Sequence, residues 1–183
     1  MLCSARPLRA LCLALALCAS YLAPARVQAE TTVGVDLFAV APIDSNYHKA
    51  GGGFGIRLGE ELHLPLLAVV PEVGFTYASF ATSGLSVYRG IVGLRAGIGE
   101  IIRFGALAHV GFGQLSVDSE PALHRVGEAN HLGFTMDGGL FLELTLLPLI
   151  NIGVHAIYNR LEGRKEGDAL QWMQFGVHAA LVF

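Results

Sequence analysis

The chain has 183 residues, enough for one domain, and a formal net charge of −3, which becomes more negative in the mature chain described below and argues against nucleic acid as a partner. Its composition is 53% hydrophobic and its mean hydropathy is +0.54. After the N-terminus, however, no uncharged apolar run approaches the ~18 residues that a transmembrane helix needs.

The first 29 residues have the pattern of a secretory signal peptide. Arg6 and Arg9 precede an apolar stretch, residues 10–22, that is too short to span a bilayer. Small residues then occupy the positions that a signal peptidase reads, which predicts cleavage after Ala29. We therefore divide the chain into a signal peptide, residues 1–29, and one mature domain, residues 30–183.

Removal of this segment changes the chemistry of the chain. All three cysteines, Cys3, Cys12 and Cys18, lie within it, so we expect no disulfide and no cysteine-bound metal in the mature domain. Nine Lys and Arg and fifteen Asp and Glu remain, and the predicted mature charge is −6.

Eight segments of the mature chain alternate between apolar and small or polar residues, the period of a β-strand with two unlike faces. They cover residues 32–41, 51–59, 66–80, 87–98, 103–115, 131–145, 151–160 and 171–183. Short turns follow the second, fourth and sixth segments, the first of them at residues 60–65. Mostly longer polar loops follow the others. Pro71 has no N–H to donate, so we expect a bulge there.

The charged residues of these segments all fall on one face of their strands. They are Asp36, Arg57, Glu72, Arg89, Arg95, Arg103, Asp137 and Glu143. The opposite face is apolar, and the charged face is rich in glycine. Charges that gather on one side of a sheet, with large apolar residues on the other, indicate a polar interior and an exterior in lipid.

The last segment of the chain carries its resemblance to a known family. Phe175, Val177, Ala179, Leu181 and Phe183 alternate up to the final residue, and the chain resembles the small eight-stranded outer-membrane β-barrels of the OmpA transmembrane-domain, OmpX and OmpW kind. The resemblance implies an all-β, antiparallel, up-and-down transmembrane barrel in the outer membrane of a Gram-negative bacterium. It also implies that these five residues form the signal read by the barrel-assembly machinery, and that lipid and lipopolysaccharide surround a monomer.

Aromatic residues of the apolar face lie near the ends of the strands, where girdles of interfacial aromatics are expected. Those predicted for the girdles are Tyr77, Tyr88, Phe104, Phe112, Phe134, Tyr158 and Phe183.

Four acids and four arginines on the inner face balance in number. Because buried charges must be paired or solvated, we predict a salt-bridge network that plugs the lumen. A structural or surface-interaction role follows. Two alternatives stay open: a narrow, porin-like channel for small or apolar solutes, and a soluble periplasmic ligand-binding barrel.

We predict no enzyme activity, no cofactor and no metal. The run from His155 to Asn159 is similar to the His-x-Ser-Asn run of the outer-membrane lipid A deacylase, but Ile157 stands where the nucleophilic Ser would be. His48, His124 and His131 come from two loops without the spacing of a metal site.

Overall fold

The structure, a computed structural model, describes residues 28–43, 50–64, 66–81, 84–117, 130–147, 149–163 and 169–183. Eight strands occupy these ranges: β1 (Gln28–Pro42), β2 (Gly51–Leu64), β3 (Leu67–Phe80), β4 (Leu85–Ile98), β5 (Ile102–Val117), β6 (Asn130–Leu147), β7 (Ile150–Glu162) and β8 (Ala169–Val182). Among the described residues no helix is long and apolar enough to cross a membrane. The signal peptide and the loop histidines His48 and His124 lie outside the described residues, and their assignments stay predictions.

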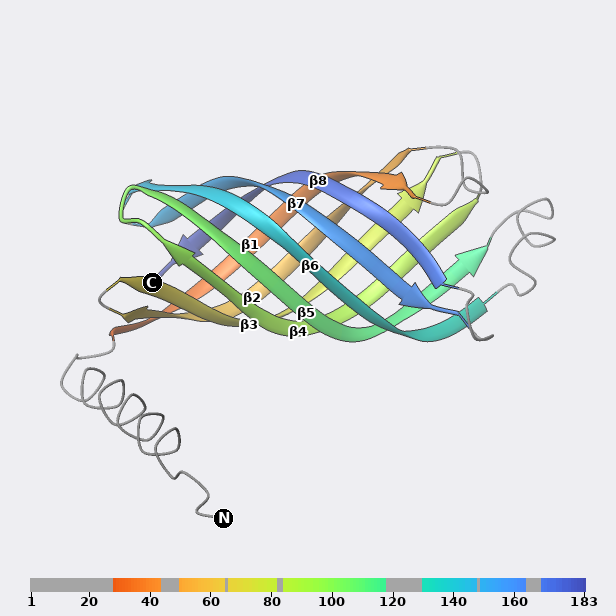
Figure 1. Cartoon of the computed structure of the whole chain (residues 1–183), viewed down its shortest axis with the longest axis horizontal. Coiled ribbons are helices and arrows are strands. Elements are labelled where there is room, and N and C mark those ends of the chain that lie inside the picture. Colours follow the sequence, from red (N-terminus) through yellow and green to blue (C-terminus); the bar gives the residue numbers. More distant parts are fainter. Residues whose placement is uncertain are drawn as a thin grey trace, which may run out of the picture.

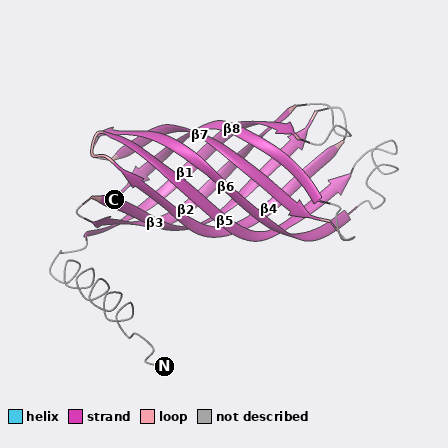
Figure 2. Cartoon of the chain, viewed as in Figure 1, coloured by secondary structure: helices cyan, strands magenta, loops and turns pink. Residues whose placement is uncertain are grey.

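The eight strands form a closed antiparallel barrel in which each strand pairs with its neighbours in sequence (Figures 1 and 2). β8 returns to β1, with register partners from Thr32–Val182 to Pro42–Trp172. The backbone pairing extends to the last residue, because Phe183 N donates to Thr31 O at 3.0 Å and Thr31 N donates to Phe183 O at 2.8 Å. The predicted eight-stranded barrel is confirmed, and its last strand has no free edge.

The start of β1 and the C-terminus lie at one end of the barrel, together with the short turns that follow β2, β4 and β6 (left in Figure 1). Gly99, in the turn between β4 and β5, has a φ of 115°, and a side chain there would clash with the backbone oxygen of Ile102. The strand ends that the longer connections join lie at the opposite end, which we call the loop end. This alternation of short and long connections agrees with the sequence pattern.

Two local predictions were wrong. The turn predicted at residues 60–65 is mostly strand, since β2 continues to Leu64 and leaves only two residues before β3. No bulge occurs at Pro71, because the pairs Gly59–Glu72 and Leu62–Val69 lie in one register. A register shift instead interrupts the β6–β7 pairing, between Leu144 and Leu147.

The two faces of the sheet differ as the alternation indicates. Leu37 is 63% exposed while its neighbour Asp36 is 5% exposed, and the same contrast recurs around the barrel. The exposed apolar side chains include Val35, Ile56, Val73, Val92, Leu94, Val110, Leu140, Leu142, Ile152, Val154 and Val177. A soluble ligand-binding barrel would have its apolar residues inside, so this distribution contradicts that alternative and favours a barrel surrounded by lipid.

Two outward-facing residues of β6 test whether the exterior of the barrel lies in lipid, because the cost of a charge there depends on its depth in the membrane. Leu140 and Leu132 both face outward from β6 and are 52% and 69% exposed, but Leu140 lies near mid-strand and Leu132 near the loop end. We expect Leu140→Arg to lower the free energy of unfolding in lipid vesicles by about 2–4 kcal/mol, and Leu132→Arg by only about 0–1 kcal/mol. Equal losses in a denaturant titration would show that the exterior is not graded by lipid depth.

Candidate functional site

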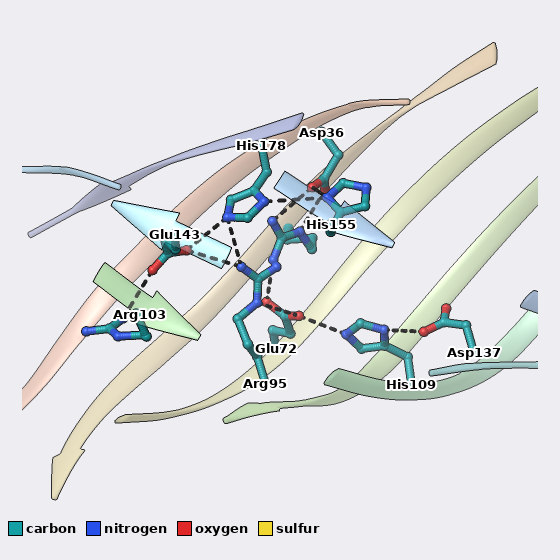
Figure 3. Close-up of polar contacts among 10 residues, drawn as sticks. Asp36, Glu72, Arg95, Arg103, His109, Asp137, Glu143, His155 and His178 are labelled. Carbon is teal, nitrogen blue, oxygen red and sulfur yellow. Dashed lines mark hydrogen bonds and ion pairs between the residues drawn. The ribbon is translucent and has the colours of Figure 1, made fainter. Parts of the chain in front are cut away.

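The lumen is the candidate site, because strand alternation directs nearly all buried charge of the described residues into it. The eight charges predicted for the inner face are all buried there. Four further titratable residues are buried with them: Glu61, His109, His155 and His178. Figure 3 shows the three histidines among the charges of the lumen.

Arg57 of β2 joins two acids from the neighbouring strands. Its Nε and Nη2 donate to Asp36 Oδ2 and Oδ1 at 2.7 and 2.9 Å, and its Nη1 donates to Glu72 Oε2 at 2.9 Å. The pairing with Asp36 is bidentate, the geometry in which a guanidinium binds a carboxylate most strongly. Arg57 therefore fixes β1 and β3 against β2 from inside the barrel.

His109 of β5 lies between two carboxylates. Its Nδ1 is 2.6 Å from Asp137 Oδ1 and its Nε2 is 2.8 Å from Glu72 Oε1. Ionised carboxylates only accept hydrogen bonds, so these contacts are those of a doubly protonated ring. Arg89 donates to the other oxygen of Asp137 at 3.2 Å and to Thr76 Oγ1 at 3.0 Å.

Glu143 of β6 is the centre of the network toward the turns. It accepts from Arg95 Nη1 at 3.4 Å, from Arg103 Nη1 at 3.2 Å and from His178 Nε2 at 2.9 Å. Arg103 also pairs with Glu61, with 2.6 Å between Nη2 and Oε1. Arg95 in addition lies 3.7 Å from Glu72 Oε1, between the two acids.

Toward the loop end the interior changes from charged to apolar. A cluster of inward apolar side chains, which we call the plug, fills this part of the lumen; it consists of Phe38, Val40, Ala78, Phe80, Leu85, Val87, Leu115, Leu161, Leu170 and Trp172. The rings of Phe80 and Trp172 meet edge to face with centroids 5.9 Å apart. The Arg89 guanidinium lies 5.1 Å from the centroid of the Trp172 ring and joins the plug to the charges.

The sequence missed parts of this interior. Glu61 was assigned to a turn, although the alternation of β2 places it in phase with Arg57 and would have identified it as inward. The plug was missed because an apolar face was assigned only to the exterior. The described part of the lumen therefore has five acids and four arginines, and His109, whose two nitrogens face two of the acids, accompanies them.

The aromatics predicted for the girdles lie on the outer face. Tyr77 and Tyr88 contact each other with centroids 4.9 Å apart, and Phe112 and Phe134 are 6.3 Å apart, both pairs toward the loop end. The Tyr158 hydroxyl donates to Gln171 Oε1 at 2.8 Å. Phe104 and Phe183, on the side of the turns, are 53% and 67% exposed.

In the closing strand, Phe175, Val177 and Leu181 each expose about half of their surface, and Ala179 is half-buried. Their alternation along β8 is thus realised on the outer face of the barrel. Recognition of these residues by an assembly machinery stays a prediction.

The segment compared with the deacylase does not form a nucleophile site. His155 and Ile157 are both buried on the lumen side, 5% and 8% exposed, and Ile157 packs with Leu107 and Phe141. His155 instead lies beside Asp36 and His178, a grouping that the sequence did not predict. The signal for it was the register, since His155 and His178 occupy adjacent inward positions on the last two strands.

No family model matches the chain, and no curated protein matches its sequence. Several solved structures, however, match the fold of the chain. Neisserial surface protein A aligns with a TM-score of 0.58 and 11% identity, over 85% of this chain and 97% of that one. Ail, the attachment invasion locus protein of Yersinia pestis, aligns with a TM-score of 0.50 and 16% identity, over 86% and 99%. The outer membrane enzyme PagL aligns with a TM-score of 0.49 and 16% identity, over 81% and 97%.

At these identities the likeness shows the fold alone. The chain has the fold of the small bacterial outer-membrane β-barrels, and its apolar exterior and charged interior are those that an outer-membrane location requires.

The contribution of Glu143, the central carboxylate of the network, to the stability of the barrel can be measured. Glu143→Gln should lower the free energy of unfolding by about 3–5 kcal/mol, because it leaves buried cations without their shared acceptor. Denaturant titration in detergent would measure this. Glu162→Gln is the matched control: Glu162 pairs with Arg160 at 2.8 Å, but both side chains are more than a third exposed, and we expect no change in the unfolding midpoint. A Glu143 variant as stable as this control would mean that the network does not hold the barrel together.

Proposed function

We propose that this protein is an integral outer-membrane barrel with a closed lumen and a structural or surface-interaction role, rather than a transport role. The filled interior is the observation that carries the proposal. The plug occupies the loop end, and paired charges together with a second apolar cluster, Leu107, Phe141 and Ile157, fill most of the rest of the described lumen. A solute would have to displace both layers, so function is expected at the outer ends and not along the axis.

The topology supports a role at the cell surface. The start of β1, the C-terminus and the short turns share one end of the barrel, and the strand ends that the longer connections join share the other (Figure 1). In outer-membrane barrels the longer loops face outward. Loops on a rigid scaffold are the usual place for binding residues, so a partner is expected to contact the loop end.

The membrane partners follow from the same placement. We propose that outer-membrane lipid and lipopolysaccharide contact the apolar exterior, with the outward aromatics at the two interfaces. The barrel-assembly machinery would read β8 through Phe175, Val177, Ala179, Leu181 and Phe183. A monomer is expected, because the closed sheet offers no edge for pairing with a second copy.

A narrow, gated channel is the second candidate, and one observation favours it. Arg95 lies 3.4 Å from Glu143 and 3.7 Å from Glu72, so its guanidinium can exchange between the two carboxylates. A small cavity toward the turns is lined by these three residues together with Arg57, Arg103 and Glu61. An exchange of partners next to a cavity is a route by which water could enter the charged layer.

Conductance in planar bilayers distinguishes the two candidates. For a closed lumen we expect no steady, salt-dependent current from the wild-type barrel, and equally none from Arg95→Gln. Each preparation should first show the gel-mobility shift on boiling that marks a closed, detergent-resistant barrel.

Steady openings of a correctly folded wild-type barrel, at a frequency that changes in Arg95→Gln, would contradict the proposal and establish the channel. A wild-type protein that appears in the soluble periplasmic fraction and shows no gel shift would contradict the membrane location itself.

A further inference from the structure

Three metal-ligating side chains meet inside the barrel where the sheet closes. Asp36 of β1, His155 of β7 and His178 of β8 come from consecutive strands of the closed sheet, and Asp36 is the register partner of His178. Each offers one ligand atom, and these atoms all lie within 4.8 Å of one another (Figure 3). All three residues are buried.

The distances between the ligand atoms fit a bound metal ion better than direct hydrogen bonds between the side chains. His155 Nδ1 is 3.5 Å from His178 Nδ1 and 3.8 Å from Asp36 Oδ1. Both distances are long for a hydrogen bond. Two donors that each lie about 2.0–2.1 Å from a tetrahedral metal are about 3.3–3.4 Å apart, so these two distances are within about half an ångström of those in a ligand set, and a bound ion would draw the three side chains together.

The outer nitrogen of His178 is held by a carboxylate. Nε2 is 2.9 Å from Glu143 Oε2 and 3.4 Å from Arg95 Nη1. A carboxylate only accepts and a guanidinium only donates, so the nitrogen can satisfy only one of them. The shorter contact indicates an N–H at Nε2, which leaves the lone pair on Nδ1, facing His155.

The outer nitrogen of His155 has a matching partner in Gln174. Gln174 Nε2 lies 3.3 Å from His155 Nε2, while Gln174 Oε1 is buried without a hydrogen-bond partner among the described residues. Gln174 is 3% exposed. Rotation of its amide by half a turn exchanges nitrogen and oxygen, and the orphan oxygen then accepts from an Nε2–H. His155 would then also present a bare Nδ1 to the cluster, and the orphan oxygen would gain a partner.

Two glycines leave the space in which these rings sit. A side chain at Gly153 would come within 2.6 Å of the His178 ring, and one at Gly176 within 2.7 Å of His155 Nε2. Both glycines are on the lumen side of their strands. The two imidazoles are thus packed against bare backbone, and their orientation is fixed from behind.

We propose that His155 Nδ1, His178 Nδ1 and Asp36 Oδ1 bind one divalent first-row transition-metal ion. Zn²⁺ is the best match, because two imidazoles and one carboxylate form a known zinc ligand set in which water takes the fourth position. Glu143 and Gln174 hold the outer nitrogens of the two rings, as partners of metal-bound histidines commonly do.

Arg57 moderates the affinity without blocking the site. It donates to Asp36 Oδ1 at 2.9 Å, and that oxygen keeps a second lone pair. Two guanidiniums, those of Arg57 and Arg95, stand near the ion, so we expect weaker binding than in closed structural zinc sites. A small cavity toward the turns is lined by Arg57 and Glu143, which contact Asp36 and His178 respectively.

The bound ion would tie together the strands at the closure of the barrel. Its ligands bridge β8 to β1 directly and β7 to both. The metal therefore adds a cross-link at the pairing of the first and last strands, which closes the barrel.

The test uses untagged protein, purified from membranes in detergent and freed of metal with a chelator. Co²⁺ is titrated with visible absorption as the readout, and Zn²⁺ is titrated by calorimetry and by competition. We expect one equivalent per barrel, a tetrahedral Co²⁺ spectrum, and Zn²⁺-dependent ¹⁵N shifts at Nδ1 of His155 and His178.

The metal affinities of three variants distinguish a ligand, the partner of a ligand and a residue outside the site. His155→Asn should weaken binding at least a hundredfold, and Gln174→Leu by roughly ten- to a hundredfold, because it removes only the partner of the outer nitrogen. His63→Asn is the control, since the His63 side chain is 42% exposed and lies outside the cluster; its affinity should equal that of wild type. Zn²⁺ should also raise the temperature at which the folded gel band disappears in wild type and not in His155→Asn.

Affinity that is unchanged in His155→Asn, or lost in His63→Asn, would place the ion at the surface and overturn the proposal. So would unshifted His155 and His178 resonances at millimolar Zn²⁺, which would mean that the rings share only a proton. If His155→Asn shows no gel shift and so does not fold, the wild-type ¹⁵N shifts decide the question.

Discussion

Charge buried in a narrow lumen is the constraint on which the rest of this structure depends. An eight-stranded barrel is barely wide enough for its own side chains, so bulk water cannot solvate the ions inside it. Each ion then needs a partner, and the partners come from distant parts of the chain: Arg89 and Asp137, like Arg95 and Glu143, are 48 residues apart. A slip of one residue in any strand would turn its charges toward lipid. The pairing therefore fixes the register of the sheet as well as the content of the lumen.

Strand number, closure and the identity of the two faces could be predicted, because all three follow from a period of two and from the cost of charge in lipid. The contacts within the lumen could not. Arg95 and Glu143 lie on β4 and β6, which are not neighbours, and alternation gives no information about side chains that meet across a barrel. Glu61 was missed for a different reason: its outward neighbour Glu60 interrupts the apolar face, so the pattern predicts a strand that ends at Gly59.

The plug is an exception to the rule that inward residues of the barrel are charged, polar or small. Phe38, Val40 and Trp172 have the same parity as Asp36 and His178, yet they are large and apolar. Near the loop end the interior no longer holds charges, so apolar side chains can fill it and bury their surface against one another. Arg89 lies at the boundary, bound to Asp137 on one side and stacked on Trp172 on the other. The lumen is thus closed twice, by packing and by ion pairing, which respond differently to salt and to mutation.

The three lumen histidines differ in how many of their ring nitrogens face a hydrogen-bonding partner, because the register places each beside different neighbours. His109 is saturated, because both of its nitrogens face carboxylates on β3 and β6. His155 and His178 each have one nitrogen occupied from behind and one turned toward the other ring, with Asp36 beside them. Asp36 is itself paired with Arg57, so the two rings lie beside an existing ion pair. The proposed metal site lies on the strand pair that closes the barrel, so an ion bound there would act on closure itself.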